Sequence, residues 1–188
     1  TGDITYLGAP LSNANRPIVL SQKVQLGSGT LIEELLAKPG PYAARDHLRA
    51  AELLREGGLE RFRSSLDRPI PSLTLSTSQA WRLAILRAAA QNPRLICVDE
   101  PTAAMDDEEA APILSLLSAQ SALRAVLFVT HNQEHARKTA NTIALMAAAQ
   151  LYGVLPQAEF FGESASPLIR EYVRTGACHV PSPDAPIE

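Results

Sequence analysis

The stretch Arg94-Leu95-Ile96-Cys97-Val98-Asp99-Glu100-Pro101-Thr102 is the most informative part of this 188-residue chain. Four apolar residues rich in β-branched types lie between the turn-forming Asn92-Pro93 and two acids. This pattern is typical of a strand that is buried on both faces of a parallel sheet, with its acids at the C-terminal edge where ligands bind. Asp99 is suited to hold Mg²⁺ through water, and Glu100 to polarise a water that attacks a phosphate. A strand followed by an acidic helix cap fits the same residues, so the neighbouring motifs have to distinguish the two interpretations.

The composition favours a globular α/β domain with a helical insert, because 46% of the residues are apolar. A net charge of −3 argues against a nucleic-acid binder that works through a basic face. Cys97 and Cys178 are too few for a disulfide framework or a metal cluster, and Cys97 is interpreted as a small buried hydrophobe in a reducing compartment. No apolar run approaches the ~18 residues that span a bilayer. We therefore expect a soluble, cytoplasmic protein. Thr1 is not a natural initiator, so we also expect that residues ahead of it are missing.

Strands and helices are predicted to alternate along most of the chain, which favours a layered and mostly parallel α/β sheet. The predicted strands cover residues 3–7, 17–20, 95–98, 124–130, 142–146 and 151–154. The predicted helices cover residues 31–36, 45–56, 59–66, 76–90, 106–120, 134–140 and 167–175. We divide the chain into an N-terminal β segment of an ATPase core (1–30), a helical subdomain (31–75), the α/β core (76–155), and a terminal helix with a disordered tail (156–188).

Polar residues follow or begin four of these elements, and each would reach the same edge of the sheet. Gln22 follows a strand, Ser76-Thr77-Ser78-Gln79 begins a helix, Asp99-Glu100 ends one strand and His131 ends the next. In this order, the motifs over residues 1–155 resemble those of the ATP-binding-cassette (ABC) ATPases. The resemblance implies a P-loop NTPase-like α/β domain, here N-terminally incomplete, with a mostly parallel sheet, a helical subdomain, and ATP and Mg²⁺ as cofactors.

Gln22, in Val19-Leu20-Ser21-Gln22, resembles the family's Q-loop glutamine. In the family this residue contacts Mg²⁺ or the attacking water and links the catalytic site to the helical subdomain. In isolation it would be interpreted as a solvated loop residue. The glycine-containing run 25–30 that follows is not a phosphate-binding loop, because it lacks the Lys-Ser/Thr pair.

Leu75-Ser76-Thr77-Ser78-Gln79 resembles the family's signature motif. There, the Ser hydroxyl, backbone N–H groups and the helix N-terminus hold the γ-phosphate of a nucleotide bound to the partner subunit. The resemblance thus makes Ser76, Thr77, Ser78 and Gln79 cofactor-binding residues. The family has two glycines where this chain has Thr77 and Ser78, and both side chains are expected to hinder close approach to a phosphate. An ordinary Ser-capped helix is the alternative interpretation.

The same resemblance implies roles for three acids and one histidine. Asp99 resembles the Walker B aspartate and Glu100 the catalytic glutamate. Asp106 resembles the D-loop residue at the interface of two ATPase subunits, and it is also expected to cap a helix. His131 resembles the switch histidine that contacts the γ-phosphate and orients water. The resemblance therefore implies Glu100 and His131 as catalytic residues, and Asp99 with Gln22 as Mg²⁺ ligands that act largely through water.

The chain departs from the family pattern in ways that bear on activity. It contains no Gly-x-x-x-x-Gly-Lys-Ser/Thr loop, which in the family precedes the segment corresponding to Thr1-Gly2-Asp3. Ala149 stands where family members often carry glycine. We expect the chain as given to bind ATP weakly or not at all. A cut piece of an ordinary transporter ATPase explains the retention of Asp99, Glu100 and His131, whereas a degenerate, non-hydrolysing relative is the alternative.

The function expected from this resemblance is that of the ATP-binding and ATP-hydrolysing subunit of an ABC transporter. Two subunits would form a head-to-tail dimer on the inner face of the membrane, and residues 31–70 would bind a transmembrane partner. A regulatory module that pairs with an intact ATPase is one alternative. A soluble ABC ATPase without a transporter is another, disfavoured by the acidic composition. The sequence does not specify the transported substrate.

Overall fold

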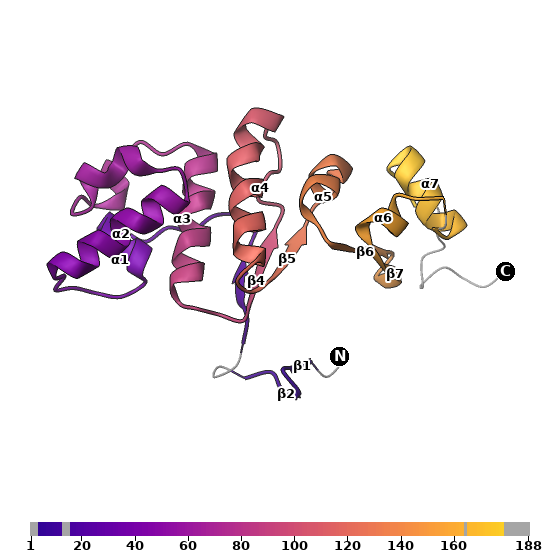
Figure 1. Ribbon diagram of the computed structural model, residues 1–188, viewed down its shortest axis with the longest axis horizontal. Helices are drawn as coiled ribbons and strands as arrows, with labels where there is room; N and C mark the ends of the chain where they lie inside the picture. Colours follow the sequence, from indigo (N-terminus) through magenta and orange to yellow (C-terminus); the bar gives the residue numbers. More distant parts are fainter. Residues whose placement is uncertain (1–3, 13–15, 164, 179–188) are drawn as a thin grey trace. The chain divides into compact units, whose positions relative to one another are not determined.

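The computed structural model describes residues 4–12, 16–163 and 165–178, and the chain forms two compact units, Thr1–Thr130 and His131–Glu188 (Figure 1). Each unit has a hydrophobic core of its own. The boundary between them falls inside the segment 76–155 that the sequence assigns to one α/β core. The predicted divisions at residues 30, 75 and 155 stay predictions.

A parallel sheet forms the centre of the first unit. Strands β3 (Ile18–Leu20), β4 (Leu95–Asp99) and β5 (Ala125–Val129) are paired in the order β3-β4-β5, and both pairs are parallel. The parallel α/β architecture predicted from the sequence is therefore confirmed for these strands. Because all three run in the same direction, their C-terminal ends lie at one edge.

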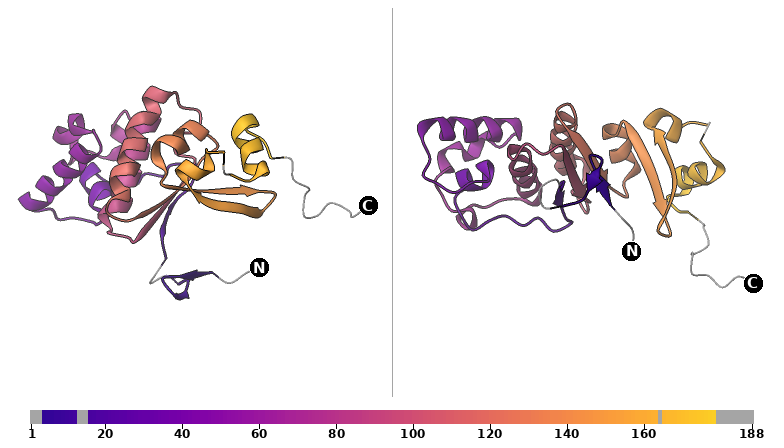
Figure 2. Two further views of the ribbon diagram at one scale, coloured as in Figure 1. Left: turned by 45° about the vertical axis from the view of Figure 1, so that its right-hand side comes forward. Right: turned by 90° about the horizontal axis from the view of Figure 1, so that it is seen from below.

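Helices α3 (Thr77–Ala90) and α4 (Asp107–Ser121) cover one face of this sheet, as Figure 2 shows in its left view. Ile96 and Val98 of β4 are buried against them. On the opposite face, Val19 is 63% and Leu127 is 52% exposed. The prediction that β4 is buried on both faces is therefore wrong within the described residues of the first unit, where Leu95 and Cys97 of β4 are only half-buried.

The burial of Cys97 in β4 also differs from the prediction of a buried residue. Its side chain is half-buried rather than enclosed, and this partial burial raises the pKa of the thiol.

The remaining elements of the first unit are a helical subdomain and a short hairpin. The subdomain contains α1 (Leu31–Leu36), α2 (Ala44–Glu56) and two 3₁₀ turns, η1 (Glu60–Ser65) and η2 (Ile70–Ser72). Thr30 caps α1 by accepting a hydrogen bond from the backbone of Glu33. The helix predicted over 59–66 is a 3₁₀ helix. Strands β1 (Thr5–Tyr6) and β2 (Ala9–Pro10) form an antiparallel pair at the start of the chain.

The second unit is a hairpin packed on short helices. It contains α5 (Gln133–Thr139), β6 (Thr142–Ala147), β7 (Gln150–Pro156), α6 (Gln157–Phe160) and α7 (Pro167–Thr175). The strands predicted at 142–146 and 151–154 are confirmed, but they pair with each other in antiparallel fashion. A parallel pair requires a crossover of a dozen or more residues, whereas only Ala148 and Ala149 separate β6 from β7.

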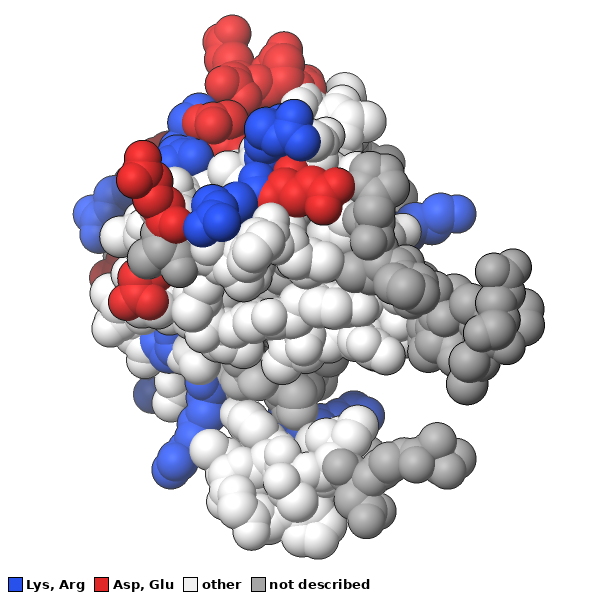
Figure 3. Space-filling view, turned by 90° about the vertical axis from the view of Figure 1, so that its right-hand side faces the viewer, with Lys and Arg blue, Asp and Glu red and all other residues white. Residues whose placement is uncertain are grey.

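The core of the second unit is formed by Leu145, Phe160, Ala165 and Ile169. Figure 3 colours the charged side chains, and on the face shown Lys and Arg side chains lie next to Asp and Glu side chains in several places. The tail predicted to be disordered, 179–188, lies outside the described residues. Among the helices of the described part of the chain, none combines the length and apolarity that crossing a bilayer requires.

Candidate functional site

The strand register places two of the predicted site segments at one edge of the sheet. Leu20 of β3 is paired with Val98 of β4. Gln22 follows Leu20 by two residues, and Glu100 follows Val98 by two. Gln22 is exposed in a bend immediately after β3, and Asp99 is the half-buried last residue of β4. The structure thus brings Gln22 and the Asp99-Glu100 pair to the same rim.

Glu100 occupies a constrained position at this rim. It is 9% exposed, and its φ of 51° is in the left-handed region that residues with a side chain rarely adopt. Its N–H donates to the Val129 carbonyl at 3.0 Å, and its carbonyl accepts from the Ala103 N–H at 3.2 Å. Strained backbone of this kind is typical of functional sites, where the surrounding structure has to hold it in place.

The start of α3 is fixed by a reciprocal set of hydrogen bonds. The Ser76 hydroxyl accepts from the Gln79 N–H at 3.3 Å, and the Gln79 side-chain oxygen accepts from the Ser76 N–H at 3.0 Å. This is a capping box. Arg61, in η1, donates to the same Gln79 oxygen at 2.8 Å. The helical subdomain therefore helps to hold the N-terminus of α3, where Ser76 and Thr77 are exposed.

Ser78 is directed into the protein rather than towards solvent. It is 7% exposed, and its hydroxyl donates to the Glu109 carbonyl of α4 at 2.8 Å. From the sequence, both Thr77 and Ser78 are expected to hinder the approach of a phosphate. In the structure, the Ser78 hydroxyl contacts α4 instead of facing solvent. Asp106 accepts from the Glu109 N–H at 2.8 Å, which confirms it as the cap of α4. The first turns of α3 and α4 are thus joined.

Two buried charged residues that contact α3 or lie on it received no role from the sequence. The Arg82 guanidinium donates to the carbonyls of Gly57 at 2.7 Å, Gly58 at 3.1 Å and Ser78 at 3.3 Å. Burial, with a smaller contribution from the nearby Arg61, lowers the pKa of Arg82. Arg82 thereby ties α3 to the end of α2. The only signal in the sequence is an arginine within an otherwise apolar helix face.

Glu34 is the second of these residues. Its side chain is 7% exposed, and its Oε1 accepts from Nη1 of Arg87 at 2.6 Å. Its Oε2 accepts from the Gly27 N–H at 3.0 Å. The sequence offers a signal, because Glu34 lies between Leu31 and Leu35 at a core-facing position of α1.

His131 belongs to the second unit, of which it is the first residue. It is exposed and precedes α5, which is capped by Asn132. The Asn132 oxygen accepts from the N–H groups of Glu134 at 2.9 Å and His135 at 3.1 Å. The relation of His131 to Gln22 and Glu100 stays a prediction.

The side chains at the rim suit Mg²⁺, which keeps several water ligands, better than a metal whose ligands all come from the protein. Among the described residues, no group of three or more His, Cys, Asp or Glu could hold a metal ion. Mg²⁺ does not require one, because it keeps several waters and binds one or two carboxylates together with substrate phosphates. The half-buried Asp99 and the exposed Gln22 lie at the C-terminal ends of neighbouring strands, and their carboxylate and amide suit such a site.

Comparison with known proteins finds the ABC transporter family, which the chain matches over residues 1–103. A methionine import ATP-binding protein MetN of Caulobacter vibrioides is 32% identical over 181 residues, 92% of this chain and 53% of that protein. The MetN protein of Sodalis glossinidius is 30% identical over 159 residues, 84% of this chain and 44% of that protein. An octopine permease ATP-binding protein P of Rhizobium radiobacter is 28% identical over 146 residues, 77% of this chain and 55% of that protein. The chain spans about half the length of the curated relatives it matches.

Proposed function

This chain belongs to the ABC transporter family, and from that premise we propose that it is part of the ATP-binding and ATP-hydrolysing subunit of a solute importer. The family implies a P-loop NTPase fold, and the parallel sheet with its helices agrees with it. The relatives are named for the import of methionine and for an octopine permease, which supports an amino-acid-type solute. The observation that carries the proposal is the shared edge of β3 and β4, where Gln22 and Asp99-Glu100 lie.

The proposed chemistry is hydrolysis of the γ-phosphate of ATP. Glu100 polarises the attacking water, and its constrained backbone supports this role because a fixed carboxylate needs little reorganisation. Asp99 and Gln22 would hold Mg²⁺ largely through water. When bound, Mg²⁺ neutralises charge on the phosphate oxygens. His131 is proposed to contact the γ-phosphate.

A second face is proposed to serve a nucleotide bound to another subunit. Ser76, Thr77, Ser78 and Gln79 would present the N-terminus of α3 to its γ-phosphate, and Asp106 would lie at the dimer interface. Two features support this assignment: the Arg61-supported capping box and the exposed position of Ser76 and Thr77. A head-to-tail dimer would then complete each site.

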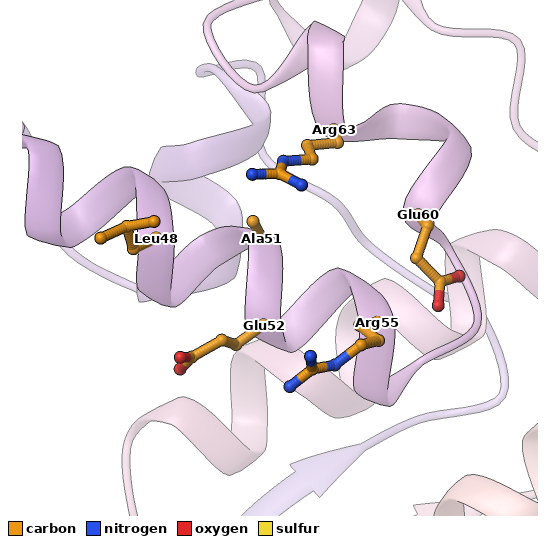
Figure 4. A pocket seen from close by; sticks show the side chains of 6 residues that line it. All are labelled: Leu48, Ala51, Glu52, Arg55, Glu60 and Arg63. Carbon is orange, nitrogen blue, oxygen red and sulfur yellow. The ribbon is translucent and has the colours of Figure 1, made fainter.

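The partner is proposed to be a transmembrane subunit that contacts residues 31–70, which would place the protein on the cytoplasmic face of the membrane. A cavity of about 300 Å³ lies in this segment, between α2 and η1 (Figure 4). It is lined by Leu48, Ala51, Glu52, Arg55, Glu60 and Arg63. Leu48 is 61% exposed there. An exposed leucine beside charged side chains of both signs suits a short amphipathic segment.

Glu100→Gln is the experiment that tests this proposal, on the whole gene product with its membrane partner. We expect the variant to bind Mg-ATP but to hydrolyse it about 10²–10⁴-fold more slowly, because an amide cannot accept the proton of water. Glu159→Gln, an exposed change on α6 that lies outside the proposed site and outside residues 31–70, is the matched control and should retain wild-type turnover. Hydrolysis should also require Mg²⁺.

Two outcomes would contradict the proposal. Unchanged hydrolysis in Glu100→Gln would remove Glu100 from the chemistry. A wild-type protein that binds Mg-ATP without hydrolysing it would indicate the regulatory module instead, and Thr77 in place of a family glycine is the observation that favours this second function.

A further inference from the structure

The carboxylate of Glu34 connects two segments to which the proposed function gives separate roles. One of its oxygens accepts from Gly27 at 3.0 Å, in the segment between β3 and α1 that also carries Gln22. The other oxygen accepts from Arg87 at 2.6 Å, in the last turn of α3, the helix that Ser76 begins. A single buried group therefore links the Gln22 segment to the signature-like helix.

The packing around this carboxylate leaves little free space. A Cβ atom at Gly27 would lie 2.9 Å from Oε2 of Glu34, so a glycine permits this approach. Both hydrogen bonds are charge-assisted, and the Glu34 side chain is 7% exposed, whereas Arg87 is 28% exposed. The Gln22 segment cannot shift far without moving Glu34 or breaking its contact with the Gly27 N–H.

Resting on the proposed function, we propose that Glu34 is a positioning residue that transmits movement between the Gln22 segment and α3, the helix that Ser76 caps. Glu34 touches no reacting atom; it acts through Gly27 and Arg87. Binding of a terminal phosphate at Gln22 would thereby alter the presentation of Ser76 to the partner subunit's nucleotide. A purely structural ion pair would instead stabilise the first unit without carrying this coupling.

Two variants separate these roles. Glu34→Gln keeps the shape of the side chain but offers one acceptor oxygen to two donors. The double variant Glu34→Arg with Arg87→Glu restores opposite charges while leaving the Gly27 N–H without an acceptor on α1. Glu159→Gln, an exposed change on α6 in the second unit, is the control.

Hydrogen exchange with and without Mg-ATP, together with steady-state hydrolysis, provides the measurement on the whole gene product. In Glu34→Gln we expect the nucleotide to protect the 21–29 segment but no longer the start of α3, and kcat to fall about tenfold or more with little change in KM. The charge-swapped pair should restore part of the melting temperature lost in Glu34→Gln but not kcat, because the Gly27 N–H still lacks its acceptor on α1. Full recovery of kcat in the swap, or unchanged protection of α3 in Glu34→Gln, would overturn the proposal.

Failure of the proposed function is recognised separately. If the wild-type protein shows no protection by Mg-ATP, the nucleotide site is refuted. Exchange of the Gly27 amide without nucleotide still tests the hydrogen bond from Gly27 to Glu34. The exchange rate of the Gly27 amide should rise about tenfold in Glu34→Gln. An unchanged rate would show that the hydrogen bond to Glu34 does not restrain the Gly27 segment. If Glu34→Gln does not fold, Gly27→Ala serves instead, because it keeps the N–H while displacing the carboxylate.

Discussion

Arg82 illustrates how a buried charge is used in this unit. Arg82 is 8% exposed, and its guanidinium donates to the backbone carbonyls of Gly57, Gly58 and Ser78. A planar fork of donors can satisfy several carbonyls at once. A buried cation held in this way joins α3 to the end of α2 and stabilises the position of the first turn of α3.

Arg82→Lys should therefore destabilise the first unit by about 2–3 kcal/mol, because one ammonium cannot reach all three carbonyls and leaves buried acceptors unsatisfied. Urea unfolding followed by the fluorescence of Trp81 measures this change. Arg49→Lys is the control, since Arg49 is exposed and pairs with Glu52 and Glu56; its effect should stay below about 0.5 kcal/mol. Equal stability of the two variants would show that the carbonyl contacts of Arg82 contribute little.

Single residues also show what the sequence can and cannot predict about the site. The position of Asp99 and Glu100 at a sheet edge follows from an apolar run that ends in acids, because that pattern is local. The contacts of Glu34 and Arg82 join residues 53 and 25 positions apart, respectively. No local pattern specifies such partners, so the sequence assigned neither residue a role.

At the scale of elements, the turn between β6 and β7 is unusual. Ala148 has a φ of 45° and Ala149 a φ of 59°, both in the left-handed region. Two-residue hairpin turns of this kind prefer Asn or Gly, because a Cβ atom is strained there. The sequence analysis noted Ala149 as a place where glycine is common, and the backbone supplies the physical reason for that preference.

Ala149→Gly should stabilise the second unit by about 1 kcal/mol, since it removes this strain at a position that already has a positive φ. Hydrogen exchange of the β6–β7 amides measures the change. Ala147→Gly, at the last residue of β6, should have the opposite effect on stability, because glycine weakens a strand. If Ala149→Gly destabilised the hairpin as Ala147→Gly does, the turn would not be strained.

Most helices and strands were predictable because their ends carry local signals. Ser76 and Asp106 cap α3 and α4 as their positions in the sequence indicate. The pairing of β6 with β7 was not foreseen, because their periodicity resembles that of the parallel strands and only the short connection distinguishes them. Likewise, the burial of β4 on one face depends on which helices cover the sheet, and a strand's own sequence does not record that.

At the scale of the whole molecule, the chain has two cores instead of one. The first includes Trp81, the single tryptophan, which is 3% exposed. The second contains Phe160, which is 2% exposed and stacks edge-on against Phe161 and Tyr172. Alternating strands and helices gave no indication of this division, because residues on both sides of Thr130 follow the same pattern.

Phe160→Ala tests whether these cores unfold independently. The lost aromatic ring should destabilise the second unit by about 3–5 kcal/mol and accelerate exchange of the β6–β7 amides. Because Trp81 belongs to the other core, its fluorescence should report an unchanged urea midpoint for the first unit. Leu83→Ala, at a fully buried position of α3, is the reciprocal variant and should lower that midpoint while leaving β6–β7 exchange unaltered. A Phe160→Ala variant in which the Trp81 midpoint falls together with the hairpin would mean that the two units unfold as one cooperative body.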